Sequence, residues 1–151
     1  MYQYNYPRPA LTADVVLFVR DDKGTRVLLI RRGKEPFMGS WALPGGFVDE
    51  NEDLKDAAVR ELKEETGIEG LDIVQVGAYG KPGRDPRGHT VSVVFASYLT
   101  SEPDYQAGDD ATEAEWFPID ELPGLAFDHE EIITDAAKLL NLGIPVTVAK
   151  N

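Results

Sequence analysis

The sequence predicts an α+β domain with a sheet of several short strands and two helices. Apolar, β-branched segments of strand length alternate with Gly- and Pro-rich turns, and they outnumber the two segments that carry helix start and stop signals. The 151 residues are the size of one domain, and the chain contains no internal repeat, low-complexity tract or linker. We therefore expect a single domain over residues 1–151.

The first predicted elements form a hairpin. Residues 13–20 (ADVVLFVR) and 26–32 (RVLLIRR) are rich in strand-forming residues, and the Asp-Asp-Lys-Gly turn at 21–24 joins them. Residues 33–46, which end in Leu-Pro-Gly-Gly, are expected to be a loop.

A helix over residues 54–66 follows the loop. Gly67 comes directly after it, and glycine is common just beyond a helix C-terminus because it adopts a left-handed conformation without strain. Two long strands are predicted next, over 71–79 and 90–99, with the Gly- and Pro-rich loop 80–89 between them.

A short strand and a second helix complete the prediction. The strand covers residues 115–119, and the helix opens at Asp128 and runs to about residue 142 before Gly143. Asp128 and Glu131 have the spacing of a capping box, in which each side chain bonds a free backbone N–H at the helix start.

The composition narrows the class of protein. There are 15 Lys and Arg against 27 Asp and Glu, a formal net charge of −12, which argues against a nucleic-acid or anionic-membrane partner because both favour exposed cations. The absence of cysteine excludes disulfides and cysteine nucleophiles, and two histidines are too few for an ordinary zinc site. No secretory signal and no apolar run near the ~20 residues of a membrane helix is visible, so we expect a cytoplasmic protein.

The first helix carries an unusual concentration of acid. Residues 49–69 contain nine acidic and three basic side chains, and Glu61, Glu64 and Glu65 stand at i, i+3 and i+4 on one helical face. Like charges at this spacing destabilise a helix, and a hard divalent cation with oxygen ligands would reverse that effect. A solvated acidic face is the alternative interpretation.

The spacing around these glutamates favours a site. Residues 46–68 read Gly-x5-Glu-x7-Arg-Glu-Leu-Lys-Glu-Glu-Thr-Gly-Ile, which resembles the signature box of Nudix hydrolases at every specified position. The preceding Trp-Ala-Leu-Pro-Gly-Gly at 41–46 and the Trp-Phe-Pro at 116–118 also resemble the family pattern. Because nine fixed positions match, chance agreement is expected in fewer than roughly one chain in a million.

The resemblance implies a fold, a reaction and a set of site residues. The fold is a Nudix-type αβα sandwich with a mixed central β-sheet and two main helices, and the reaction is hydrolysis of a diphosphate linked to a nucleoside. Mg²⁺, with Mn²⁺ as a possible substitute, is the implied cofactor. Its implied ligands are the Gly45 carbonyl and the carboxylates of Glu61, Glu64 and Glu65. Glu52 and Arg60 are the implied partners that orient the metal-binding helix during catalysis.

Weaker markers indicate the substrate. Loop 80–89 carries three cations within seven residues, and we expect Arg84 and Arg87 to clamp phosphate, although solvated charges on a hairpin loop are the alternative. Pro82 resembles a proline that marks ADP-ribose pyrophosphatases, as do the Arg-Asp-Pro-Arg run at 84–87 and the Phe-Asp-His segment at 127–129. The implied reaction converts ADP-ribose and water to AMP and ribose 5-phosphate.

Further residues have two interpretations each. Arg31 and Arg32 end a strand beside the site, and they either contact the diphosphate or are solvated. Phe37 and Trp41 either stack on adenine or belong to the hydrophobic core. His129, near a helix start, favours a structural role over proton transfer.

Two groups of residues extend the list of candidates. The acidic residues before Trp116 have three interpretations: one of them is an additional metal ligand, one is a general base, or they belong to a surface turn. These residues are Asp109, Asp110 and Glu113. Three tyrosines near the N-terminus occupy every second position, as side chains on one face of a strand do. This spacing favours packing at the edge of the sheet or in a homodimer interface; the residues are Tyr2, Tyr4 and Tyr6.

Three alternatives to an ADP-ribose hydrolase stay open. One is a Nudix pyrophosphatase for NADH, a nucleotide sugar or a damaged nucleoside triphosphate. Another is a non-catalytic ADP-ribose-sensing module, as in transcriptional regulators that resemble the opening Tyr-Pro-Arg-Pro-Ala-Leu-Thr at 6–12, although the intact box and the acidity argue against it. The chain is also compatible with being part of a larger bifunctional enzyme.

Overall fold

The computed structural model describes residues 2–106 and 111–149. In chain order the elements are β1 (Ala10–Asp21), β2 (Gly24–Arg32), β3 (Trp41–Ala42), β4 (Gly45–Phe47), α1 (Leu54–Thr66), β5 (Val74–Tyr79), β6 (Thr90–Leu99), β7 (Ala111–Pro118) and α2 (His129–Leu139). Neither helix in this part of the chain is long and apolar enough to cross a membrane.

The sheet is mixed. Its main path runs β3-β2-β1-β6-β5, with β7 paired to β2 and β4 paired to β1. The central pair β1 and β6 is parallel, whereas the other pairs are antiparallel. The predicted hairpin between β1 and β2 forms, with Asp21 opposite Gly24.

Strand β1 changes partner along one edge. Its last residues, from Phe18 onward, pair with β2, whereas Thr12–Asp14 pair with β4. Between these stretches the N–H of Val15 donates to the carbonyl of Pro44 at 2.9 Å. The edge is therefore shared by two short partners, and the chain between β3 and β4 crosses the place where they part.

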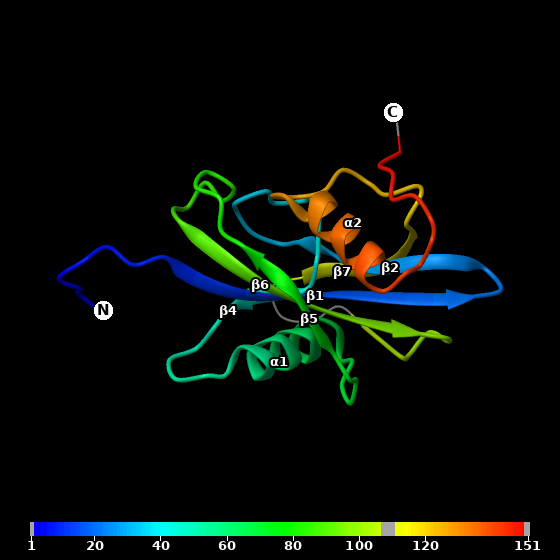
Figure 1. The fold of residues 1–151 in the computed structure, drawn as a ribbon, viewed down its shortest axis with the longest axis horizontal. Coiled ribbons are helices and arrows are strands. Elements are labelled where there is room, and N and C mark those ends of the chain that lie inside the picture. The colour runs from blue at the N-terminus through cyan, green and yellow to red at the C-terminus, as the bar shows by residue number, and fades with distance from the viewer. Residues whose placement is uncertain (1, 107–110, 150–151) are drawn as a thin grey trace.

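The helices cover opposite faces of the sheet, as Figure 1 shows, which confirms the predicted αβα sandwich. Side chains of β1 alternate between the layers because successive residues of a strand point to opposite faces. Val15 and Leu17 belong to the core beneath α1, and Val16 and Phe18 to the core beneath α2.

Several predicted boundaries are confirmed and others are corrected. The helix over 54–66 and the strand over 90–99 have the predicted bounds, and Gly67 adopts the left-handed conformation with φ 76°. Strand β5 begins at Val74 instead of 71, and the preceding Ile73 is buried in the core beneath α1 outside any strand. Strands β1 and β7 begin earlier than predicted, and α2 ends at Leu139.

Two predictions about local structure were wrong. Residues 33–46 are not only loop, because β3 and the start of β4 lie within them; strands of two and three residues are too short to show alternation. The capping box at α2 does not form, since Asp128 makes no side-chain cap hydrogen bond. Its carboxylate binds Arg84 instead.

Candidate active site

Helix α1 presents two of its glutamates to strand β4. Its buried residues Ala57, Ala58 and Leu62 pack in the core beneath the sheet and fix the rotation of the helix. Glu61 and Glu65 are one turn apart. Glu65 accepts a hydrogen bond from the N–H of Gly45 at 3.0 Å, so the helix is tied to β4 through one of the predicted ligands.

The two glycines of β4 make this approach possible. A Cβ atom on Gly46 would lie 2.6 Å from the carboxylate carbon of Glu61, and one on Gly45 would overlap the carboxylate of Asp14. Only a residue without a side chain fits at either position. The glycines therefore bring the backbone of β4 directly against carboxylates.

Arg60 organises the outer carboxylates of the helix. Its Nε and Nη2 donate to Glu52 at 2.8 and 2.9 Å, and its Nη1 donates to Glu61 at 2.8 Å and to Glu64 at 3.2 Å. The hydrogen bonds from Arg60, followed by one from the backbone of Asp49, lower the pKa of Glu52 to about 2. The predicted orienting role of Glu52 and Arg60 depends on this arrangement.

Three carboxyl groups resist ionisation. Burial raises the pKa of Glu65 to about 8 and that of Asp14 to about 7, and it also raises the pKa of Glu61. The negative charge of Glu61 raises the first two values further, since the groups are neighbours. The local hydrogen-bond donors therefore do not fully compensate the cost of ionising these three groups.

A cavity of about 300 Å³ opens beside these groups. It reaches both layers of the sandwich, because Glu61 and Glu65 of α1 line it together with Asp14 and with His129 of α2. It is also lined by Gly45, where β4 pairs with β1. The site thus occupies the place where β1 changes partner.

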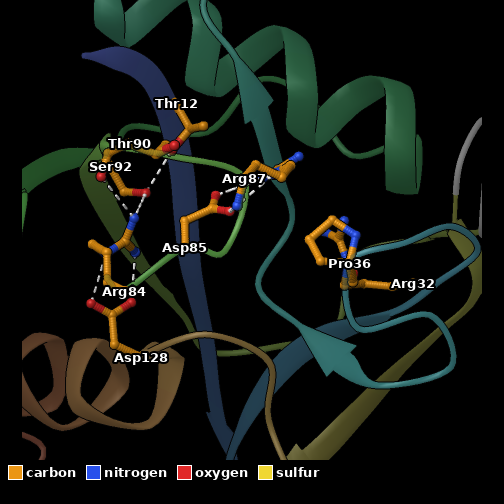
Figure 2. A network of polar contacts seen from close by, with 9 residues as sticks. All are labelled: Thr12, Arg32, Pro36, Arg84, Asp85, Arg87, Thr90, Ser92 and Asp128. Carbon is orange, nitrogen blue, oxygen red and sulfur yellow. Dashed lines mark hydrogen bonds and ion pairs between the residues drawn. The ribbon is translucent and has the colours of Figure 1, made fainter. Parts of the chain in front are cut away.

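Basic side chains line the same cavity; they are Arg32, Lys34, Arg84 and Arg87. Figure 2 shows that Arg84 is held from two sides. It donates to Asp128 from Nε and Nη2 at 2.8 and 2.6 Å and to the Ser92 hydroxyl from Nη1 at 2.9 Å, and its side chain is only 4% exposed. Its predicted contact with substrate phosphate stays a prediction.

Arg32 and Arg87 are more available to a ligand. Arg87 pairs with Asp85 at 2.8 Å and lies over the ring of Phe47, 4.8 Å from its centroid. Arg32 donates from Nε to the carbonyl of Pro36 at 2.6 Å (Figure 2). Burial lowers the pKa of Arg32, and the nearby positive charge of Arg87 lowers it further. Two guanidinium groups held in mutual repulsion are a favourable place for an anion.

Other predicted contacts lie outside the cavity. Arg31 pairs with Glu113 at 3.2 Å across β2 and β7, and neither lines the cavity. Pro82 does not line it either. Asp109 and Asp110 lie outside the described residues.

The aromatic candidates divide between rim and core. Phe37 is 41% exposed and meets Phe127, a lining residue, edge to face at 4.8 Å, so it is not a core residue. Trp41 packs on Phe117 in the core beneath α2. Residues 2–9 form no strand, and the exposed rings of Tyr2 and Tyr4 stack on each other.

His129 is a structural residue in this arrangement. Its Nδ1 accepts the N–H of Leu43 at 3.0 Å, and burial lowers its pKa to about 3, so it is neutral. Sequence reasoning missed Asp14 and Asp85 as lining residues. Asp14 had a signal, because a charged residue inside an apolar strand is expected to be functional or paired.

The chemistry of the site fits a divalent cation. Among residues 2–106 and 111–149 no group of three acidic or histidine side chains is already arranged to bind a metal ion. Glu61 and Glu64 instead form ion pairs with Arg60. However, the hard oxygen donors of Glu61, Glu65 and the Gly45 carbonyl are suited to such an ion. Burial disfavours the ionised form of both carboxyl groups, and a bound cation would stabilise that form. Cation binding there competes with Arg60.

The fold and the cavity define a class: an αβα sandwich in which a carboxylate-bearing helix faces an arginine-lined wall, suited to a phosphorylated ligand and cations. The particular family follows from comparison with known proteins. The NUDIX domain matches residues 10–136, and this chain belongs to that family. Its members generally need a divalent metal.

Two relatives and two solved structures illustrate the likeness. The chain is 46% identical over 136 residues to the ADP-ribose pyrophosphatase of Methanocaldococcus jannaschii, covering 90% of this chain and 78% of that protein. It is 36% identical to the ADPR responsive transcriptional repressor NtrR of Acinetobacter baylyi, covering 91% and 56%. The NUDIX domain of Shewanella oneidensis NrtR, solved with ADP ribose, superposes with a TM-score of 0.82 at 33% identity, covering 89% and 90%. A MutT/nudix family protein from Enterococcus faecalis gives 0.86 at 36% identity, covering 93% and 65%.

Proposed function

We propose that this chain is a Mg²⁺-dependent hydrolase that converts ADP-ribose and water to AMP and ribose 5-phosphate. The observation that carries the proposal is the cavity itself, which is lined both by Glu61 and Glu65 and by Arg32 and Arg87. Identity of 46% to an ADP-ribose pyrophosphatase supports the choice of substrate.

The chain's own residues divide the work. Glu61, Glu64, Glu65 and the Gly45 carbonyl would hold the cation, which polarises phosphorus and lowers the pKa of an attacking water. Arg32 and Arg87 would bind the non-bridging phosphate oxygens and stabilise the negative charge that develops on the leaving phosphate. The water oxygen would form a bond to one phosphorus and lose a proton to solvent. The bond between that phosphorus and the bridging oxygen would break, so the bridging oxygen leaves with the other phosphate.

The second candidate is an ADP-ribose sensor without turnover. It is favoured by the 36% identity to an ADPR responsive repressor. S. oneidensis NrtR has also been solved with a 27mer DNA, and this chain covers 61% of that NrtR chain. The intact glutamate box favours the enzyme instead.

A panel assay separates these functions. Purified chain with Mg²⁺ is incubated with ADP-ribose, NADH, a nucleotide sugar and an oxidised nucleoside triphosphate, and the products are resolved by chromatography. We expect AMP and ribose 5-phosphate to be formed fastest. Turnover of ADP-ribose no faster than of triphosphates refutes the substrate, and tight binding without product supports the sensor.

We also propose a homodimer that lacks nucleic-acid affinity and acts in the cytoplasm. The exposed tyrosines near the N-terminus support the dimer, and the net charge of −12 supports the lack of nucleic-acid affinity. Light scattering after size exclusion tests the dimer. A labelled-DNA shift assay tests the lack of nucleic-acid affinity, and cell fractionation tests the cytoplasmic location.

A further inference from the structure

Three buried polar side chains form one wall of the cavity. Thr12 and Asp14 of β1 and Ser92 of β6 lie on the same face of the parallel strand pair, with exposures of 6%, 6% and 3%. All three line the cavity. Nothing in the diphosphate chemistry described above uses them, although burying polar side chains is costly unless they are bonded.

A chain of hydrogen bonds fixes the carboxylate of Asp14. Arg84 donates to the Ser92 hydroxyl at 2.9 Å, and Thr12 and Ser92 share a bond of 2.6 Å (Figure 2). Ser92 is also hydrogen-bonded to Asp14. Since serine has a single hydroxyl hydrogen, it donates that hydrogen to Asp14 and accepts from Arg84 and Thr12.

This network leaves accepting capacity on Asp14. A carboxylate has about four lone-pair sites, of which Ser92 uses one. The group that such an acceptor binds well, in a closed pocket, is a pair of neighbouring hydroxyls. Hydrogen bonds from Arg84 to Asp128, from Arg84 to Ser92 and from Ser92 to Asp14 form one network. This network holds the Asp14 carboxylate in place before a ligand binds.

We propose that Asp14, positioned by Ser92, forms the subsite for the terminal sugar of the substrate, the one that carries no base. This inference rests on the proposed function. Asp14 is opposite Gly45 in the sheet and close enough to Glu61 for their charges to interact, so whatever binds Asp14 is next to the diphosphate. In a nucleoside diphosphate sugar the groups adjacent to the diphosphate are the two sugars.

The buried residues around Asp14 select between those two sugars. The sugar of the nucleoside carries a base on its far side, which would need space beyond Asp14. Thr12, Ser92 and the buried Arg84 are grouped there, away from Arg32 and Pro36 (Figure 2). The terminal sugar has only a hydroxyl there. The nucleoside end is then directed towards the rim, where Phe37 and Phe127 offer aromatic faces.

Binding of the two products tests the subsite without requiring turnover. Calorimetry with Mg²⁺ measures the affinity of ribose 5-phosphate and of AMP for the wild type, for Asp14→Asn and for Asp72→Asn. The last variant removes one carboxylate charge at an exposed position outside the cavity. We expect Asp14→Asn to weaken ribose 5-phosphate binding roughly 10- to 100-fold, as for loss of a charged hydrogen bond. AMP binding should change less than about 2-fold, and Asp72→Asn should leave both affinities at the wild-type value.

Each outcome decides the question. Equal weakening of both products, loss confined to AMP, no change, or a wild type that does not bind ribose 5-phosphate overturns the sugar subsite. If Asp14→Asn fails to fold, Ser92→Ala must give the same selective loss, because it releases the carboxylate. A wild type that binds both products but does not release AMP from ADP-ribose refutes the proposed function and leaves the subsite standing.

Discussion

Replacement of Glu65 by glutamine should stabilise the protein while it abolishes turnover. Burial raises the pKa of Glu65 from 4.5 to about 8, and the group is only 9% exposed. At pH 7 the unfolded chain holds this group ionised and the folded chain holds it protonated, which costs about 3 kcal/mol at 1.36 kcal/mol per pH unit. Glutamine is neutral and can still accept the Gly45 N–H, so it removes most of this cost.

The pH dependence gives the sign of the effect. Between pH 4.5 and 8 the folded wild type binds more protons than the unfolded chain, so this group's contribution to stability falls as pH rises through that window. In Glu65→Gln that slope is absent. Up to about 3 kcal/mol corresponds to a Tm increase of roughly 6–12 °C for a chain of this size.

Thermal melts without divalent cation measure the shift, with Glu64→Gln as the matched control. The Glu64 side chain is 43% exposed, so we expect little change in its Tm, although both variants should lose several orders of magnitude in kcat. Saturating Mg²⁺ should raise the Tm of the wild type and not that of Glu65→Gln. A Glu65→Gln variant that melts at or below the wild type at pH 7–8, or that retains turnover, refutes the reasoning.

Three further predictions concern the surroundings of the site. Gly46→Ala should lower kcat/KM at least about 10-fold, because its Cβ would meet the carboxylate of Glu61, whereas Gly77→Ala, with nothing within 4 Å, should not; steady-state kinetics compare them. Asp128→Asn should cost about 3 kcal/mol in urea denaturation, because it leaves a buried guanidinium without its charge partner, and an unchanged midpoint contradicts this. His129, whose pKa is lowered from 6.5 to about 3, should make stability fall as pH drops through that window, and His129→Gln should flatten this limb of the melting profile.

The sequence predicted what local signals determine. Helix α1 has the predicted bounds because its apolar stripe and the glycine that ends it lie within the same segment. Asp128 shows the limit of such signals. Its spacing to Glu131 indicates a capping box, yet its carboxylate is taken by Arg84, 44 residues away, because a buried guanidinium requires a charged partner.

Residues that meet only through tertiary structure were harder to predict. Asp14 was grouped with the apolar residues of its strand, and its exposure to the cavity depends on β4 pairing with the first part of β1. Strand β4 itself is three residues long and contains two glycines, so neither propensity nor alternation indicates a strand. The box that it begins was recognisable only as a motif.

The same topology that hides these residues from sequence reasoning creates the site. Strand β1 is longer than either partner on its edge, so that edge is divided between β4 and β2. At the division, Glu61 and Glu65 from the α1 side share a cavity with Arg84 and Asp14 from the other side. Because a continuous sheet would separate these side chains by its full thickness, the change of partner is what allows acidic and basic side chains from both layers to line one cavity.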